Sequence, residues 1–239
     1  MSRQRRDIDQ HGAASLVDKV RRVDGVRAIE RALGGGARRV DVSGLRGTAP
    51  SFVVEALRGS LGGAFLVCCP DEETARDVHA DLDTVSPSRV AFFPAKDIFP
   101  QRFEVKENLS VRGKRNACLD DIRAGQVDIV VTSLVGFLEK TIRVDKLKTN
   151  VRRISVGEEL DLEALRGHLV DVGYEAMSII EEPGQFAVRG AIVDLFDPSW
   201  DDPVRLELLD DEVISIRAFD IETQRSNLQL ESVRLLPAT

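Results

Sequence analysis

The sequence predicts an α/β protein in which a parallel-sheet domain is followed by a small α+β domain with a mostly antiparallel sheet. In the first half, short apolar runs alternate with segments of helical periodicity, which is typical of a parallel sheet covered on both faces. After Asn150, strand-like runs follow one another across short turns, and no helix of useful length follows Val172. This change of pattern predicts two domains, at residues 1–149 and 150–239.

The first domain is expected to begin with a helix over residues 14–33, which ends at three consecutive glycines. A second clear helix is expected from Asp71, whose side chain suits an N-cap, to Val85. Further helices are expected at residues 52–61, 107–124 and 134–140. The strands between them are expected at residues 38–43, 64–69, 89–93 and 127–132.

The second domain is expected to contain one main helix over residues 161–172, with Leu162, Leu165 and Leu169 on one face. Strands are expected at residues 151–156, 175–180, 186–188, 191–196, 204–209, 213–219 and 229–235. Paired aspartates at residues 201–202 and 210–211 mark two of the turns.

The composition is that of an ordinary globular chain, since 43% of the 239 residues are hydrophobic and 31% are charged. No apolar run approaches the roughly 18 residues that a transmembrane helix needs, and the charged N-terminus lacks the apolar core of a secretory signal. The three cysteines and three histidines show no metal-ligand spacing, so we expect neither a metal site nor a cofactor. These features predict a cytoplasmic protein without a membrane partner.

The net charge of −7 is unevenly distributed along the chain. Residues 151–239 contain 19 acidic residues, 8 arginines and no lysine, which leaves 21 acidic and 25 basic residues in the first 150. The two parts therefore carry −11 and +4, which supports two units of different surface character. The acidic second part argues against nucleic-acid binding there, because phosphates require cations.

The loop over residues 44–51 follows the first expected strand and can be aligned with a phosphate-binding P-loop, G-x-x-x-x-G-K-[ST]. Gly44 takes the first glycine position, Ser51 takes the final hydroxyl position, and Gly47 lies between them. Ala49 replaces the second glycine and Pro50 replaces the lysine. Proline supplies neither an ammonium group nor a backbone N–H, although it suits the first turn of a helix. We interpret the loop as a degenerate P-loop that does not bind nucleotide.

Other signs of catalysis are missing from the sequence. The apolar run at residues 127–132 does not close in an acidic pair that could hold Mg²⁺, and no Ser, His and Asp set forms a recognisable motif. We therefore expect no catalytic residue, no small-molecule substrate and no ATP hydrolysis. The alternative is a nucleotide-binding or ATPase module of a helicase-like enzyme. A DNA-binding accessory is a third alternative, which the acidic second part disfavours.

An arginine at a strand break is the most informative feature of the second domain. A turn at Pro183-Gly184 opens two strand-forming runs, which are separated at Arg189-Gly190 and predict a tight hairpin or a bulge. On a later strand, Arg205, Glu207 and Leu209 share one face because strands alternate with period two. Arginines beside an exposed leucine are typical of a protein interface. The alternative is a solvated strand face with a weak ion pair.

Three segments carry a resemblance to a known family: FAVRGAIVDLF at 186–196, VRLELLDDEVISIRAFDIETQRS at 204–226 and VRLLPA at 233–238. They resemble the N-terminal, excinuclease-B-like region of bacterial transcription-repair coupling factors. The first 150 residues are compatible with it through the degenerate P-loop, FLVCCPDEETARDVHADL and DIVVTSLVGFLEK. The resemblance implies a degenerate helicase-like domain (1A-like) followed by a small domain 2, which together form only the N-terminal fraction of the family.

In that family, domain 2 binds the excinuclease A protein and so recruits nucleotide excision repair. By matched position, the resemblance implies partner binding by Arg189 and Arg205, with Glu207 and Leu209 on the same strand face as Arg205. Leu209 stands where relatives often carry an aromatic residue, and it offers less area for burial. The family's ATP-dependent DNA translocase motor, and its contacts with RNA polymerase and DNA, lie in C-terminal domains absent from this sequence. The resemblance thus implies a non-catalytic protein-interaction region.

Overall fold

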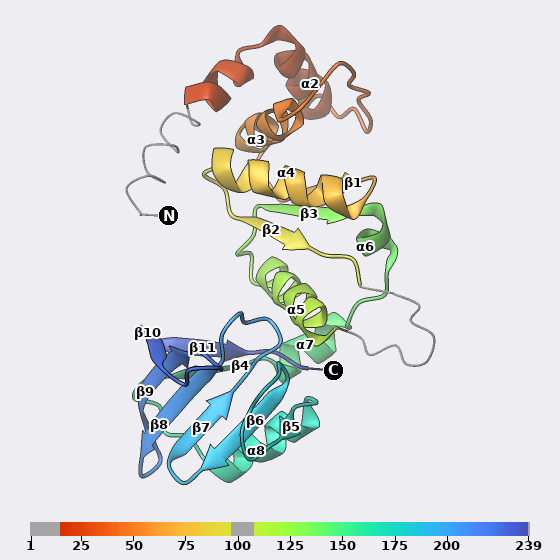
Figure 1. Cartoon of the computed structure of the whole chain (residues 1–239). Coiled ribbons are helices and arrows are strands. Elements are labelled where there is room, and N and C mark those ends of the chain that lie inside the picture. The colour runs from red at the N-terminus through yellow and green to blue at the C-terminus, as the bar shows by residue number, and fades with distance from the viewer. Residues whose placement is uncertain (1–14, 97–107, 239) are drawn as a thin grey trace. The chain divides into compact units, whose positions relative to one another are not determined.

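The structure is a computed structural model that describes residues 15–96 and 108–238 (Figure 1). Contacts divide the chain into two compact units, Met1–Ala95 with Asp121–Glu139, and Lys96–Asp120 with Lys140–Thr239. The predicted mixture of a parallel sheet and a mostly antiparallel sheet is confirmed. The division differs from the expected boundary between residues 149 and 150, because residues 96–120 and 140–149 group with the second unit.

The first unit is built on a three-stranded parallel sheet with the order β1-β3-β2. Its strands are β1 (Phe65–Cys69), β2 (Val90–Phe93) and β3 (Ile129–Ser133). Helix α4 (Glu72–Val85) packs on the sheet, with Ala75 and Leu82 buried against Ile129 and Val131 (Figure 1). Asp71 caps α4 as predicted, because its carboxylate accepts a hydrogen bond from the backbone N–H of Thr74 at 2.7 Å. The edge strand β1 is not covered on both faces, since its Leu66 is 53% exposed.

A helical cluster precedes the sheet in the chain. It comprises a helix over residues 15–21, α2 (Asp24–Gly34) and α3 (Ala49–Leu61), while the short α6 (Leu134–Leu138) follows β3. The strand predicted at residues 38–43 is wrong, because this segment has no strand pairing. Val42 is 48% exposed, and Arg39 pairs with Asp41 at 2.9 Å on the surface. Alternating valines among charged residues did not supply enough buried area to form a strand.

The second unit contains a six-stranded sheet with the order β10-β9-β8-β7-β6-β5, antiparallel except for the β5–β6 pair (Figure 1). The strands are β5 (Glu175–Ala176), β6 (Gln185–Arg189), β7 (Ile192–Leu195), β8 (Val204–Leu209), β9 (Glu212–Phe219) and β10 (Ser226–Leu230). Helix α8 (Leu162–Asp171) buries Leu165 and Leu169 against Phe186, Val193 and Leu206 on one face of this sheet. The opposite face has no helix packed on it among the described residues, but Ala187 and Phe219 on that face are buried with Ile180, Phe196 and Ile221.

Two turns set the register of the central strands. Gly190 has φ 61° and forms, with Ala191, the two-residue loop between the paired Arg189 and Ile192. Asp210 has φ 54° in the loop between β8 and β9, where the aspartate pair predicted a turn. The predicted strand 229–235 is in fact two strands, β10 and β11 (Ser232–Leu235). β11 leaves the six-stranded sheet to pair with β4 (Arg152–Ser155).

Helices α5 (Leu109–Arg123) and α7 (Val144–Asn150) complete the second unit. On α5, an added Cβ at Gly113 would lie 2.2 Å from the carbonyl carbon of Pro198, so the helix and that loop are in backbone contact. The Asn116 amide donates to the carbonyl of Pro237 at 3.1 Å, and Arg234 pairs with Asp120 at 3.0 Å. These contacts fasten α5 to the C-terminal segment that carries the VRLLPA motif.

A buried polar network also contacts the C-terminal segment that carries the VRLLPA motif. The Tyr174 hydroxyl donates to the Asp197 carboxylate at 2.7 Å, which also accepts from the backbone N–H groups of Leu236 at 2.6 Å and Ser199 at 2.8 Å. Burial raises the pKa of Asp197 above its ordinary value. Burial, together with the neighbouring charge of Asp197, raises the pKa of Tyr174 well above 10.

This network predicts a specific alkaline sensitivity. Tyr174 ionises more easily in the unfolded chain than in the folded one, so its stabilising contribution is complete below about pH 10 and is lost as the pH rises through the folded pKa. Tyr174→Phe is expected to cost about 1 kcal/mol at neutral pH and to reduce the alkaline loss of stability. Tyr174 is the only tyrosine, so tyrosinate absorbance reports its ionisation directly. Native tyrosinate at its ordinary pKa would contradict the prediction.

Candidate partner-binding face

The outer face of the six-stranded sheet is the face opposite α8. Strand register places the predicted site residues on it, because Arg189 pairs with Ile192, Asp194 with Arg205, and Ile192 with Glu207. Neighbouring residues alternate inward to the core that α8 covers, as Val193 and Leu206 do. The residues that we assign to the outer face are Arg189, Ile192, Asp194, Arg205, Glu207, Leu209, Ile214, Arg217 and Phe219.

A buried carboxylate joins the two predicted arginines. The Asp194 side chain is 3% exposed and lies between Arg189 and Arg205. Arg205 donates from Nε to Oδ1 at 2.6 Å and from Nη2 to Oδ2 at 3.0 Å, and Arg189 donates from Nη2 to Oδ2. The guanidinium of Arg205 therefore engages Asp194 in a bidentate pair, the geometry that gives arginine–carboxylate contacts their strength. We call these three residues the arginine clamp.

The two arginines of the clamp differ in what remains accessible. Arg205 is 20% exposed in its side chain, lies 4.5 Å over the ring of Phe219 and donates to Gln224 at 3.1 Å. Hydrogen bonding to Asp194 raises the pKa of Arg205 above its ordinary value. The side chain of Arg189 is 43% exposed. Arg205 is thus fixed within the protein on several sides, while Arg189 presents much more of its guanidinium to solvent.

Beside the clamp the outer face carries a second ion pair and several exposed apolar side chains. Glu207 lies 3.5 Å from Arg217, and no direct pair between Glu207 and Arg205 forms. Leu209 is 65% exposed at the end of β8, and Ile214 and Ile192 are 48% and 36% exposed. Positive charge held in place beside exposed aliphatic side chains is the composition that protein interfaces favour.

Sequence reasoning found four residues of this face and missed the one that connects them. The structure brings Arg189 and Arg205 together on Asp194, and it places Glu207 and Leu209 on the same face but outside the clamp. Asp194 lies between Val193 and Leu195 in an otherwise apolar strand. An acidic residue in such a run was a signal for a buried cationic partner. Arg217 and Ile214 had no comparable signal, because a bulge between Glu207 and Leu208 shifts the register of β9.

The loop at residues 44–51 does not have the surroundings of a P-loop. No strand directly precedes it, since residues 38–43 are not a strand. Gly44 and Gly47 have φ values of 85° and 57°, while Ala49 and Pro50 open helix α3. The Ser51 side chain is 1% exposed, so its hydroxyl is turned into the protein and away from any phosphate in the loop. Among the described residues, no group of three or more His, Cys, Asp or Glu side chains is placed to hold a metal ion.

Comparison with known proteins gives a family match for the second unit. Residues 152–239, which contain the arginine clamp, match the family model described as UvrB interaction domain. This part of the chain is therefore similar to UvrB interaction domains.

The chain as a whole is similar to transcription-repair-coupling factors. It is 32% identical over 209 residues to the one from Myxococcus xanthus (84% of this chain, 17% of the relative) and 29% identical over 220 residues to the one from Bacillus subtilis (92% and 19%). It is 34% identical over 158 residues to the one from Staphylococcus epidermidis (66% and 13%). The chain spans less than a fifth of the length of these relatives. The resemblance to the N-terminal region of transcription-repair-coupling factors is confirmed.

Proposed function

We propose that the outer face of the second unit binds the excinuclease A protein and thereby recruits nucleotide excision repair to a stalled transcription complex. The observation that carries the proposal is the arginine clamp. Asp194 holds both guanidinium groups in place before a partner arrives, so less side-chain entropy is lost on binding. Arg189 then supplies an accessible cation, and Leu209, Ile192 and Ile214 supply apolar area around it.

Leu209→Glu is expected to weaken binding to purified excinuclease A protein at least tenfold, because it places a charge where apolar area becomes buried. The side chain is 65% exposed, so the folded state should tolerate the change. Val170→Glu is the matched control, since Val170 is 55% exposed on α8, away from the outer face. Calorimetric titration of both variants measures the difference. Equal affinities for the two variants would rule out this face as the binding surface.

The enzyme alternative predicts a different result. A nucleotide-binding or ATPase module would bind ATP with Mg²⁺ through the loop at residues 44–51. The proposal holds instead that this chain is non-catalytic and that the first unit is a helicase-like domain with a degenerate P-loop. The absence of nucleotide binding is supported by Pro50 at the lysine position, by the buried Ser51 and by the missing strand before the loop, while the helicase-like assignment rests on the resemblance. Saturable, Mg²⁺-dependent ATP binding that Ser51→Ala abolishes would favour the enzyme.

The wider features of the proposal come from the resemblance and from the composition. In the family that the chain resembles, the ATP-dependent translocase and its contacts with RNA polymerase and DNA belong to other regions. A cytoplasmic location, without a membrane partner or small-molecule substrate, is consistent with a repair factor. Among the described helices, none is both long and apolar enough to cross a membrane.

A further inference from the structure

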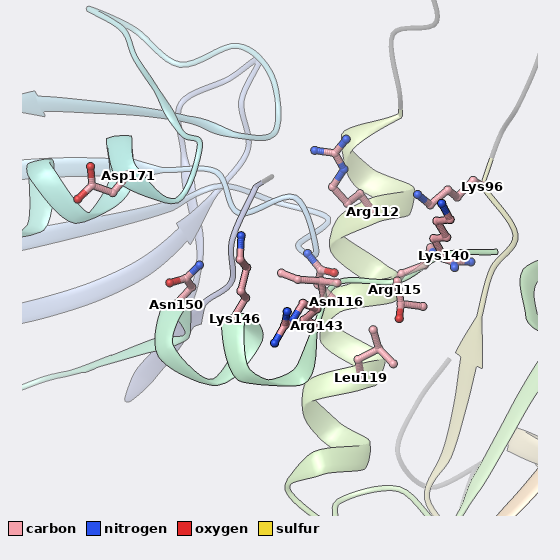
Figure 2. Close-up of a pocket in the computed structure, with 12 residues that line it drawn as sticks. Lys96, Arg112, Arg115, Asn116, Leu119, Lys140, Arg143, Lys146, Asn150 and Asp171 are labelled. Carbon is pink, nitrogen blue, oxygen red and sulfur yellow. The ribbon is translucent and has the colours of Figure 1, made fainter.

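The second unit contains a cationic pocket that has no part in the proposed partner-binding face. Its volume is about 580 Å³, within the range of about 300–1,000 Å³ for ligand pockets. Among the described residues, six basic side chains and one acidic side chain, Asp171, line it (Figure 2). The basic residues are Lys96, Arg112, Arg115, Lys140, Arg143 and Lys146.

Helical spacing explains how these side chains converge. On α5, Arg112, Arg115, Asn116 and Leu119 recur at intervals that place them along one side of the helix. Arg143 precedes the first residue of α7, and Lys146 and Asn150 follow at helical spacing on that helix (Figure 2). Helices α5 and α7 therefore position several of the lining side chains.

The cations of the pocket stand out against the acidic composition of the second unit. All six basic residues precede residue 151, in the part of the sequence with excess positive charge, and only Asp171 comes from the acidic part. Arg143 is paired with Asp145 at 3.0 Å. Neither Lys140 nor Lys146 has a carboxylate within 4 Å in the described part of the chain. These two lysines thus keep a positive charge that no described carboxylate neutralises.

We propose that this pocket binds the phosphate backbone of a single nucleic-acid strand. Lys140 and Lys146 offer the point-charge donors that phosphates take, and they lie beside the guanidinium groups of the lining arginines. A strand supplies one phosphate per nucleotide to successive cations, whereas a free nucleotide presents its phosphates at one end. Among the described residues, the lining has no aromatic ring, and its large apolar side chains are Leu119 and Ile142, so these residues contact the backbone and do not stack the bases.

The test is fluorescence anisotropy of a labelled thymidine oligonucleotide titrated with the 239-residue chain at several salt concentrations. Lys140→Glu/Lys146→Glu is the test variant, because both lysines are exposed and line the pocket. We expect it to weaken binding at least tenfold. The slope of the logarithm of affinity against the logarithm of salt concentration should become shallower by the amount that about two phosphate contacts contribute. Lys114→Glu/Lys148→Glu is the matched control. It changes the net charge by the same amount as the test variant, and its lysines lie on α5 and α7 but do not line the pocket.

Three results would overturn the proposal. The first is no saturable binding by the wild-type chain, and the second is an equal loss of affinity in the two double variants, which would indicate diffuse electrostatics. The third is displacement of the oligonucleotide by ATP or by polyglutamate as effectively as by unlabelled DNA, because the pocket would then recognise a free nucleotide or an acidic protein segment. Selective loss in Lys140→Glu/Lys146→Glu, with DNA as the strongest competitor, supports it.

Discussion

Arg205→Ala is expected to lower the free energy of unfolding of the second unit by about 3 kcal/mol. The substitution leaves the Asp194 carboxylate, which is 3% exposed, without its bidentate partner. It also removes the contact with the ring of Phe219. The estimate is at the low end for breaking a buried ion pair, because Arg189 still contacts Asp194. Urea unfolding followed by Trp200 fluorescence measures it, since Trp200 is the only tryptophan and packs against the core of this unit.

Arg189→Ala is the control for that measurement, and its expected cost is at most about 1 kcal/mol. The Arg189 side chain is 43% exposed, so water replaces much of the interaction that the substitution removes. We therefore expect Arg205 mainly to stabilise the fold and Arg189 mainly to contact the partner. Equal losses of stability in the two variants would contradict the burial difference within the clamp. Charge reversal at Arg205 is a poor probe of binding, because it would unfold the surface under test.

Gly113→Ala is the second change with a large expected effect, again about 3 kcal/mol of lost stability in the second unit. The new Cβ would lie 2.2 Å from the carbonyl carbon of Pro198 and 2.4 Å from the backbone nitrogen of Ser199. Backbone atoms cannot move aside as a flexible side chain can, so α5 must shift away from the loop. The measurement is the same urea titration with Trp200 fluorescence, because Trp200 lies next to this loop in the sequence.

Gly167→Ala provides the matched helix control. Gly167 lies inside α8, and nothing is within 4 Å of the position of an added Cβ. Alanine favours a helix over glycine by up to about 1 kcal/mol, so this variant should be slightly stabilised. Loss of stability in both variants, or in neither, would show that the close approach of α5 to Pro198 does not determine the change in stability.

The parts of the fold that could be predicted from the sequence are those with local signals. Asp71 before a helical repeat predicted the N-cap of α4, and the leucines at 162, 165 and 169 predicted the buried side of α8. The failures depended on partners distant in the chain. Residues 38–43 alternate like a strand but find no neighbour. The run at 229–235 divides because β11 pairs with β4, almost 80 residues earlier.

Part of the geometry of the candidate site was predicted as well, while its role in binding stays a prediction. Strand alternation placed Arg205, Glu207 and Leu209 on one face, the family resemblance added Arg189, and the structure has all four on one face. The clamp itself was not predicted, because the contact of two arginines with one carboxylate depends on the register of β6, β7 and β8. The cationic pocket was not predicted either. Its lining comes from residues that are spread over four segments and that the expected domain boundary assigned to both domains.

The most direct test of the proposed function is a calorimetric titration of purified excinuclease A protein with the 239-residue chain. The wild-type chain is expected to bind saturably, and Arg189→Ala is expected to weaken binding about tenfold while the chain remains folded. Arg166→Ala, at an exposed arginine of α8, should bind like the wild type. Saturable binding lost selectively with Arg189→Ala is the predicted result. No binding by the folded wild-type chain, or identical affinities for Arg189→Ala and Arg166→Ala, would contradict the account.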